Sequence, residues 1–173
     1  MIIRDAAAAD LAAITAIYAH HVLHGTGTFE ETPPTEAEMA TRTAKVQGGG
    51  HAWLVADQDG RVAGYGYYAP FRERSAYRFT AEDSIYVRND VRGMGVGKAL
   101  VQALLERAEA AGIRQMIAVI GDSENVGSIG LHAALGFRQV GVMKAVGLKF
   151  GQWVDVVTMQ RSLGEGERSL PQD

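Results

Sequence analysis

The sequence predicts one α/β (α+β) domain, built on a central mixed β-sheet with helices on both of its faces. Three observations lead to this prediction. The chain has 173 residues, of which 47% are hydrophobic, and this is enough for one buried core. Apolar residues recur at helical spacing in some segments and alternate in others. The segments follow one another in the order βααβββαβαββ, which gives about seven strands and about four helices.

The N-terminal part of the chain predicts a short strand and two helices. Apolar side chains recur at helical spacing around Leu11, Ile14 and Ile17, which indicates the first helix. Thr35, with Glu38 three positions later, forms a capping box and predicts where the second helix begins. The glycines and prolines between the helices are typical of a loop. The expected elements are a strand over 2–4, a helix over 6–23, a loop over 24–34 and a helix over 35–46.

The middle of the chain predicts a hairpin, a connector and a further strand. The pair Asp59-Gly60 lies between two apolar runs, as in a tight hairpin turn. A polar stretch with aromatic residues follows, and then an alternating run that indicates a strand. The expected elements are the hairpin over 51–70, the connector over 71–80 and the strand over 81–87.

The C-terminal half predicts two helices and three strands. Gly112 and Gly136 mark the ends of the helices, because glycine commonly follows the last helical residue. Residues 164–173 are polar and are expected to form a frayed tail, and residues 1–163 are expected to form the domain. The expected elements are helices over 96–112 and 125–137, a strand over 114–121, and two strands within 138–163 with a break near 147–151.

The composition argues against several classes of protein. The 17 Lys and Arg residues are balanced by 20 Asp and Glu residues, and no basic block stands out, so nucleic acid is not expected as a partner. The chain has no cysteine, which excludes a disulfide scaffold, a thiolate metal site and a cysteine nucleophile. No signal peptide and no apolar stretch of roughly 20 residues is present, so we expect a soluble, cytoplasmic protein without a membrane partner.

The most informative stretch is RGMGVGKAL, residues 92–100. Three glycines at alternate positions follow a predicted strand and open a predicted helix. Glycine lets the backbone approach a ligand closely, and a helix N-terminus attracts anions. Arg92 adds a positive charge that a turn needed only for packing would not require. The stretch therefore predicts a site for a phosphate-bearing ligand.

Two common phosphate-binding motifs do not fit this stretch. A P-loop would need glycine in place of Arg92 and serine or threonine in place of Ala99. A dinucleotide fingerprint would need glycine in place of Lys98 or Leu100. The pattern that fits is Arg-x-x-Gly-x-Gly, starting at Arg92.

This pattern resembles the pyrophosphate-binding motif of the GNAT family of N-acetyltransferases. The segments EDSIYVRNDVRGMGVGKAL, AVIG, N..S..LH.ALGF and KFGQWVDVVTMQ are similar to its phosphinothricin and methionine sulfoximine acetyltransferase branch. The resemblance extends to residue 163, and a motif specific to that branch lies at Lys149, Gly151, Trp153 and Asp155. It implies the GNAT fold with a twisted sheet, acetyl-coenzyme A as co-substrate, a small amino-acid-like amine as substrate, no metal, and a homodimer with substrate sites near the interface.

Glu82 is the expected general base. An amine must lose its proton before it can form an amide, so a base helps. On the predicted strand Glu82 shares one face with Ser84 and Tyr86, whereas Asp83, the rival base, faces the other way. In the resembled family the acid at the position of Glu82 is the proposed base. A solvated carboxylate at the edge of the sheet is the alternative.

Without a cysteine nucleophile, direct attack by the amine in a ternary complex is the expected route. The family often uses a tyrosine on the last helix to protonate the leaving thiolate, but no tyrosine follows Tyr86. His132 matches a histidine of the herbicide-detoxifying members and is the second expected catalytic residue. A histidine that only packs in the helix is the alternative.

The resemblance also implies the residues that hold the two substrates. For Asn125 and Ser128, helix capping is an equal alternative. For the arginines of the connector, bidentate pairing with a carboxylate is the physical reason, and a solvated charged surface is the alternative. The residues expected to bind the coenzyme are Val87, Arg88, Arg92, Gly93, Met94, Gly95, Val96, Gly97, Lys98, Asn125 and Ser128. Those expected to bind the amine are Phe29, Arg72, Arg74 and Tyr77.

Other functions are weighed against this one. His20 and His24 have a spacing that suits a helical metal site, but no glutamate follows His20, so no functional metal is expected. An acetyltransferase for a protein N-terminus or a polyamine is a second enzymatic reading, although the arginine-rich connector favours an anionic substrate. A non-catalytic acyl-coenzyme A sensor would keep the glycine stretch and would not need Glu82 or the connector.

Overall fold

The computed structural model describes residues 1–171, and these form one sheet in the order β1-β2-β3-β4-β5-β7-β6. Neighbouring strands are antiparallel except β4 and β5, which are parallel, so the predicted mixed sheet is confirmed. The strands are β1 (Ile2–Asp5), β2 (Trp53–Gln58), β3 (Arg61–Pro70), β4 (Thr80–Val87), β5 (Gln115–Gly121), β6 (Arg138–Lys149) and β7 (Gln152–Ser162). The α-helices are α1 (Leu11–His24), α2 (Glu36–Gly48), α3 (Val96–Ala110) and α4 (Val126–Ala134).

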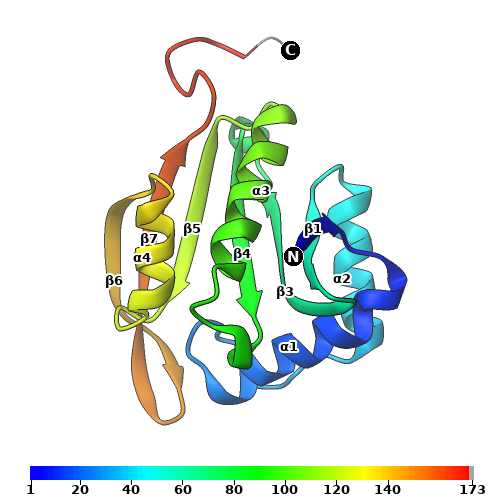
Figure 1. Ribbon diagram of the computed structural model, residues 1–173. Helices are drawn as coiled ribbons and strands as arrows, with labels where there is room; N and C mark the ends of the chain where they lie inside the picture. The colour runs from blue at the N-terminus through cyan, green and yellow to red at the C-terminus, as the bar shows by residue number, and fades with distance from the viewer. Residues whose placement is uncertain (172–173) are drawn as a thin grey trace.

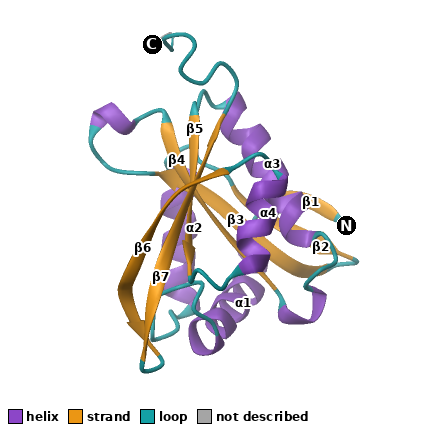
Figure 2. Cartoon of the chain, turned by 90° about the vertical axis from the view of Figure 1, so that its left-hand side faces the viewer, coloured by secondary structure: helices purple, strands orange, loops and turns teal. Residues whose placement is uncertain are grey.

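The helices cover both faces of the sheet, as predicted. α3 and α4 lie on one face, and α1 and α2 on the other (Figure 1). Figure 2 shows the twist of the sheet and the long hairpin of β6 and β7 at its edge. Each face has its own core: Leu100 of α3 is fully buried with Met116 of β5, and Ile14 of α1 is buried with Trp53 of β2. The core thus consists of two layers separated by the sheet.

The first two helices begin where local hydrogen bonds place them. The capping box is confirmed, because the Thr35 hydroxyl accepts from the Glu38 N–H at 3.2 Å and the Glu38 carboxylate accepts from the Thr35 N–H at 2.6 Å. The first helix was predicted to start near residue 6, and this is wrong: α1 begins at Leu11, after a short 3-10 turn. The Asp10 carboxylate accepts from the Ala7 N–H and from Arg4, which holds residues 7–10 outside the helix.

The final hairpin differs in detail from the prediction. The break expected near 147–151 is a bulge followed by a tight reversal, with β6 continuing to Lys149. The pairing shifts between Met143 and Gly147, and Ala145 between them has a φ of 54°. The Asp155 carboxylate accepts from the Ala145 N–H at 2.9 Å, so a side chain of β7 stabilises the bulge of β6. The sequence pattern did not indicate this contact.

The C-terminal tail leaves the body at the end of the sheet where β7 stops (Figure 1). Its first residues are held by Arg114, whose guanidinium donates to the Gly166 carbonyl and to the Ser169 hydroxyl, both at 3.3 Å. Residues 172–173 of the predicted tail lie outside the described residues. Within residues 1–171, none of the helices combines the length and the hydropathy that a bilayer crossing requires.

Candidate active site

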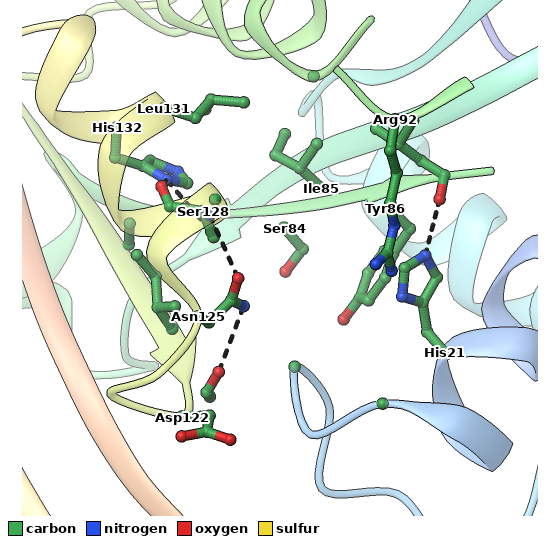
Figure 3. Close-up of a pocket in the computed structure, with 18 of the residues that line it drawn as sticks. His21, Ser84, Ile85, Tyr86, Arg92, Asp122, Asn125, Ser128, Leu131 and His132 are labelled. Carbon is green, nitrogen blue, oxygen red and sulfur yellow. Dashed lines mark hydrogen bonds between the residues drawn. The ribbon is translucent and has the colours of Figure 1, made fainter. Parts of the chain in front are cut away.

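The site lies where β4 and β5 separate. The two strands pair in parallel through four residue pairs, the last of which joins Asp83 to Ala118. β4 continues to Val87 and β5 to Gly121, and these strand ends have no pairing with each other. A cavity of about 720 Å³ opens between them and is lined also by the end of α1, the glycine turn before α3 and the start of α4 (Figure 3). The separation of two parallel strands therefore creates the space for a ligand.

The three glycines of the turn serve two different purposes. Gly93 and Gly95 line the cavity with φ angles of 77° and 81°, a conformation that residues with a side chain rarely adopt. No other heavy atom lies within 4 Å of the place where a Cβ of either residue would stand. At Gly97 a Cβ would lie only 2.7 Å from Leu131 Cδ1, so glycine lets α3 approach α4. The turn thus leaves its backbone open to the cavity.

The N-terminus of α3 is an anion site by its geometry. The first helical hydrogen bond from this turn runs from the Ala99 N–H to the Gly95 carbonyl, and no side chain caps the helix. The N–H groups before Ala99 therefore have no partner within the helix. The exposed side chains of Arg92 and Lys98 also line the cavity. Positive charge and the helix dipole together favour a phosphate here.

Asn125 and Ser128 form the opposite wall, at the start of α4. The Asn125 side chain accepts from the Ser128 N–H at 3.2 Å and donates to the Gly121 carbonyl at 3.4 Å (Figure 3). Helix capping, the alternative considered for these residues, is thus one of their roles. Both residues line the cavity as well, so capping and ligand contact are compatible.

Val87, Arg88 and Met94 are placed differently from one another. Val87 lines the cavity, and its carbonyl accepts from His21 Nε2 at 2.9 Å. The Arg88 N–H donates to the Ala63 carbonyl, and the Arg88 carbonyl accepts from the Val91 N–H, so both backbone groups are engaged within the chain. Arg88 is also not among the residues that line the cavity, which argues against the expected contact of Arg88 with the coenzyme. The Arg88 side chain pairs with Asp90. Met94 is 61% exposed at the tip of the turn.

His132 lines the cavity from α4 and forms a buried pair with Asp83 of β4. His132 Nε2 lies 3.1 Å from Asp83 Oδ2, and His132 Nδ1 lies 2.8 Å from the Ser128 carbonyl oxygen. Burial by itself lowers the pKa of His132, but its contacts with Asp83 and the Ser128 carbonyl outweigh this and raise it. Asp83 Oδ1 is buried without a hydrogen-bond partner in the described chain.

Glu82 lies on the other face of the sheet, as the alternation predicts. It is partly buried and is not among the residues that line the cavity. Burial raises the pKa of Glu82, the neighbouring Asp83 adds to this, and Arg72 acts in the opposite direction. A half-buried carboxyl group with a raised pKa is better suited to accept a proton near neutral pH than a solvated one.

The four residues expected to bind the amine lie outside the cavity. Arg72, Arg74 and Tyr77 are exposed on the connector between β3 and β4, and the Tyr77 ring packs edge-on against Phe71 at 5.8 Å. Ala69 of β3 pairs with Glu82, and Arg72 follows three positions later, so this end of the connector begins beside Glu82. Phe29 lies in the α1–α2 loop against Gly147, where a Cβ would stand 2.5 Å from the ring.

Lys149 ties the α1–α2 loop to the final hairpin. Its ammonium group donates to the carbonyl oxygens of Gly25 and Thr28, each at 2.7 Å, and its side chain is only 2% exposed. Burial lowers the pKa of Lys149. Thr26 of the same loop donates to the Asp122 carboxylate at 2.8 Å. The α1–α2 loop, which closes one side of the cavity, is therefore held by two contacts, one to Lys149 of β6 and one to Asp122 after β5.

Sequence reasoning did not single out His21, Thr26 or Asp122 as parts of the site. His21 lies at the end of α1, and burial lowers its pKa, so a neutral ring with a proton on Nε2 can donate to Val87. Neither its spacing nor its neighbours signalled this contact. The described residues hold no group of three histidine, aspartate or glutamate side chains arranged to bind a metal ion.

Comparison with known proteins links this geometry to a reaction. Residues 14–137 match the family model described as the acetyltransferase (GNAT) family. The chain is 55% identical to a phosphinothricin N-acetyltransferase of Alcaligenes faecalis, over 94% of this chain and 83% of that protein. It is 45% identical to an L-methionine sulfoximine/L-methionine sulfone acetyltransferase of Pseudomonas paraeruginosa, over 98% of both chains.

A solved structure matches the whole architecture. It is the crystal structure of a GNAT superfamily phosphinothricin acetyltransferase from Sinorhizobium meliloti in complex with acetyl-coenzyme A. The TM-score is 0.96 at 53% sequence identity, over 99% of this chain and 93% of that chain. The fold of this chain is therefore that of a phosphinothricin acetyltransferase whose structure contains acetyl-coenzyme A.

Proposed function

This chain belongs to the GNAT acetyltransferase family and is an acyltransferase, and we propose that it transfers the acetyl group of acetyl-coenzyme A to a small amino-acid-like amine. Phosphinothricin, methionine sulfoximine and related methionine derivatives are the proposed substrates, because relatives at 55% and 45% identity carry those names. The observation that carries the proposal is the glycine turn, with its uncapped helix and its cations, at the cavity between the separated strands.

The coenzyme fits the residues around this cavity. A Cβ at Gly93 or Gly95 would project into open space, so the backbone of the turn can contact a pyrophosphate directly. Arg92 and Lys98 supply the charge that its phosphates require. The cavity-lining residues that would hold the coenzyme are Val87, Arg92, Gly93, Gly95, Val96, Gly97, Lys98, Asn125 and Ser128, and Met94 at the exposed tip of the turn is proposed as a further contact. When bound, it supplies an acetyl thioester to the reaction.

Glu82 is the proposed general base. Burial and the negative charge of Asp83 raise its pKa, which increases its tendency to take a proton from the attacking amine. Because the chain has no cysteine, the proposed attack is direct, in a ternary complex of enzyme, thioester and amine. His132, which lines the cavity from the opposite side of β4, is the second proposed catalytic residue, and its charge is proposed to stabilise the leaving sulfur.

The connector is proposed to recognise the carboxylate of the substrate. An α-amino acid carries its amine and its carboxylate on one carbon, so a base and a cation must lie close together to bind both groups. Arg72 and Glu82 are suited to this, because Arg72 follows three positions after Ala69, the β3 residue that pairs with Glu82. Arg74 and Tyr77 on the same connector, and Phe29 in the α1–α2 loop, complete the proposed substrate contacts.

A homodimer is the proposed assembly. β6 is an edge strand, and edge strands offer unpaired backbone groups. Apolar side chains of β6, the turn and the start of β7 are more than one-third exposed and gather on this edge, which is the pattern of a protein–protein interface. The residues are Val140, Val142, Met143, Val146, Leu148, Phe150 and Trp153.

Release of free thiol from acetyl-coenzyme A in the presence of a panel of amines tests the function. The panel contains phosphinothricin, methionine sulfoximine, methionine sulfone, an alanine-initiated peptide and spermidine. We expect turnover with the first three compounds. Turnover confined to the peptide or to spermidine would replace the proposed substrate class, and coenzyme binding without any turnover would make the chain a sensor.

A further inference from the structure

Asp83 and His132 form a buried pair that lines the cavity. They come from β4 and α4, 49 positions apart in the sequence, and their side chains are only 2% and 4% exposed. Asp83 is also the last residue of β4 that pairs with β5. The pair therefore stands at the point where the two strands separate and the cavity begins.

The hydrogen bonds of the pair determine how many protons it holds. The Ser128 carbonyl oxygen, 2.8 Å from His132 Nδ1, can only accept, so Nδ1 carries a proton. His132 Nε2 lies 3.1 Å from Asp83 Oδ2, and two bare acceptors would repel each other at this distance. A second proton must therefore lie between Nε2 and Oδ2. The pair holds one proton more than a neutral imidazole beside a carboxylate.

Stability alone does not favour this arrangement. A buried ion pair is often no more stable than apolar side chains of similar size. Asp83 Oδ1 is buried and has no hydrogen-bond partner among the described residues, so His132 is the partner that holds this carboxylate. A pair kept at such a cost beside a cavity is a candidate for a functional role.

We propose that Asp83 is a positioning residue that keeps His132 doubly protonated beside the cavity, so that the positive charge of the ring stabilises the leaving sulfur as a thiolate. The inference rests on the proposed function. In the transfer, the nitrogen lone pair forms the C–N bond and the C–S bonding pair departs with the sulfur. The amine gives its proton to Glu82, and His132 keeps both of its protons in their hydrogen bonds to Ser128 and Asp83. Afterwards Glu82 releases a proton to water and the thiolate takes one up from water, so the enzyme is regenerated.

The surroundings of the ring support this role for Asp83. Asp83 is the charged group that acts on His132, and it raises the pKa of the imidazole against the effect of burial. The other contacts are the Ser128 carbonyl, the Ser128 hydroxyl at 3.5 Å, and the Phe137 ring, which packs edge-on with centroids 4.9 Å apart. The pair therefore depends on a single carboxylate.

Nitrogen-15 NMR of the ligand-free enzyme, labelled at histidine, tests the protonation state without any substrate. The chain has five histidines, and the His132→Gln variant identifies the signal. We expect both ring nitrogens of His132 to carry protons at pH 7. In Asp83→Asn the amide can donate to Nε2, so the ring keeps its orientation and loses its second proton. A wild-type ring with a single proton at pH 7 would overturn the inference.

Steady-state kinetics then tests the role in catalysis. We expect Asp83→Asn to lower kcat at pH 7 by about 10²-fold or more, the scale of losing one group that stabilises the developing charge. The alkaline limb of the kcat profile should move to lower pH, which a structural defect alone would not cause. The control is Asp59→Asn, the same change in the exposed β2–β3 turn, for which we expect wild-type values.

The outcomes separate this inference from the function on which it rests. An active wild-type enzyme whose Asp83→Asn variant keeps the same kcat and the same alkaline limb would overturn the role of the pair alone. A wild-type enzyme that acetylates no amine of the panel would overturn the proposed function, and the role of the pair with it. If Asp83→Asn does not fold, the wild-type NMR spectrum still decides whether the second proton is present.

Discussion

Glu82 and Asp83 are neighbours on β4, and their carboxyl groups lie on opposite faces of the sheet. Asp83 contacts His132 of α4, whereas Glu82 lies on the face that α1 and α2 cover. The alternation of side chains along a strand is the cause. One strand thus presents a proposed proton acceptor to one face and the carboxylate that holds His132 to the other, at the point where β4 and β5 separate.

Replacing Glu82 by glutamine tests its role as the base. Glu82→Gln keeps the shape of the side chain and cannot take a proton, so kcat should fall by roughly 10²–10⁴ at neutral pH. Only the deprotonated carboxylate acts, and burial raises its pKa above 4.5, so the acidic limb of the wild-type profile should lie above that value. The limb should disappear in the variant. Glu106→Gln on the exposed side of α3 is the control, and a variant with the wild-type profile would exclude Glu82 as the base.

Arg72 and Arg74 should differ in their effects on pH dependence. Arg72 lowers the pKa of Glu82, so Arg72→Ala should raise that pKa and move the acidic limb of kcat/KM to higher pH. Arg74→Ala should leave the limb in place and raise KM for amino-acid substrates, since a charge-assisted contact contributes about 1.5–3 kcal/mol. The pH profiles of kcat/KM for the two variants and the wild type test this. If the acidic limb lies at the same pH in both variants, Arg72 does not act on Glu82.

Lys149 should stabilise the α1–α2 loop. Lys149→Met removes the donor for the Gly25 and Thr28 carbonyls and should lower the free energy of unfolding by about 1–3 kcal/mol. A loss of 1 kcal/mol corresponds to roughly 2–4 °C in Tm for a domain of this size. KM for the amine should rise, because the loop flanks the site. Lys45→Met, on the exposed surface of α2, serves as the control, and equal Tm values for both would refute the anchor.

Gly121 should be required for close approach of the same loop. A Cβ at this position would lie 2.3 Å from the Thr26 carbonyl oxygen, a backbone atom that cannot swing away. Gly121→Ala should therefore destabilise the protein by about 1–3 kcal/mol. Gly130 in α4 has no atom within 4 Å of its Cβ position, so Gly130→Ala should stabilise by up to about 1 kcal/mol. Chemical denaturation of the two variants measures the change in the free energy of unfolding. If both variants are destabilised, or both are stabilised, this account is wrong.

The proposed dimer depends on the apolar edge formed by β6. Leu148 is 58% exposed there, and Leu148→Glu should convert a particle of twice 18.5 kDa into a monomer. Ile2→Glu makes the same change on β1, the opposite edge of the sheet, and should leave the mass unchanged. Light scattering after gel filtration measures this. A wild-type monomer at micromolar concentration would rule out the dimer.

Local signals in the sequence predicted most of the fold. The capping box at Thr35 and the glycines after α3 and α4 act within a few residues, so their effects are visible in the sequence. The start of α1 was wrong because the Asp10 carboxylate is bound by Arg4, in the preceding strand. The bulge of β6 was missed for the same reason, since its partner Asp155 lies on another strand.

The sequence by itself determined the glycine turn, the strand before it and the alternation that separates Glu82 from Asp83. These depend on backbone conformation and on neighbours along the chain. Only the tertiary structure decided that Asp83 meets His132 and that Lys149 holds Thr28, contacts between residues 49 and 121 positions apart. The physical reason is that a buried polar group takes its partner from whichever element the packing brings beside it. That choice depends on sheet order and helix placement, which no local pattern encodes.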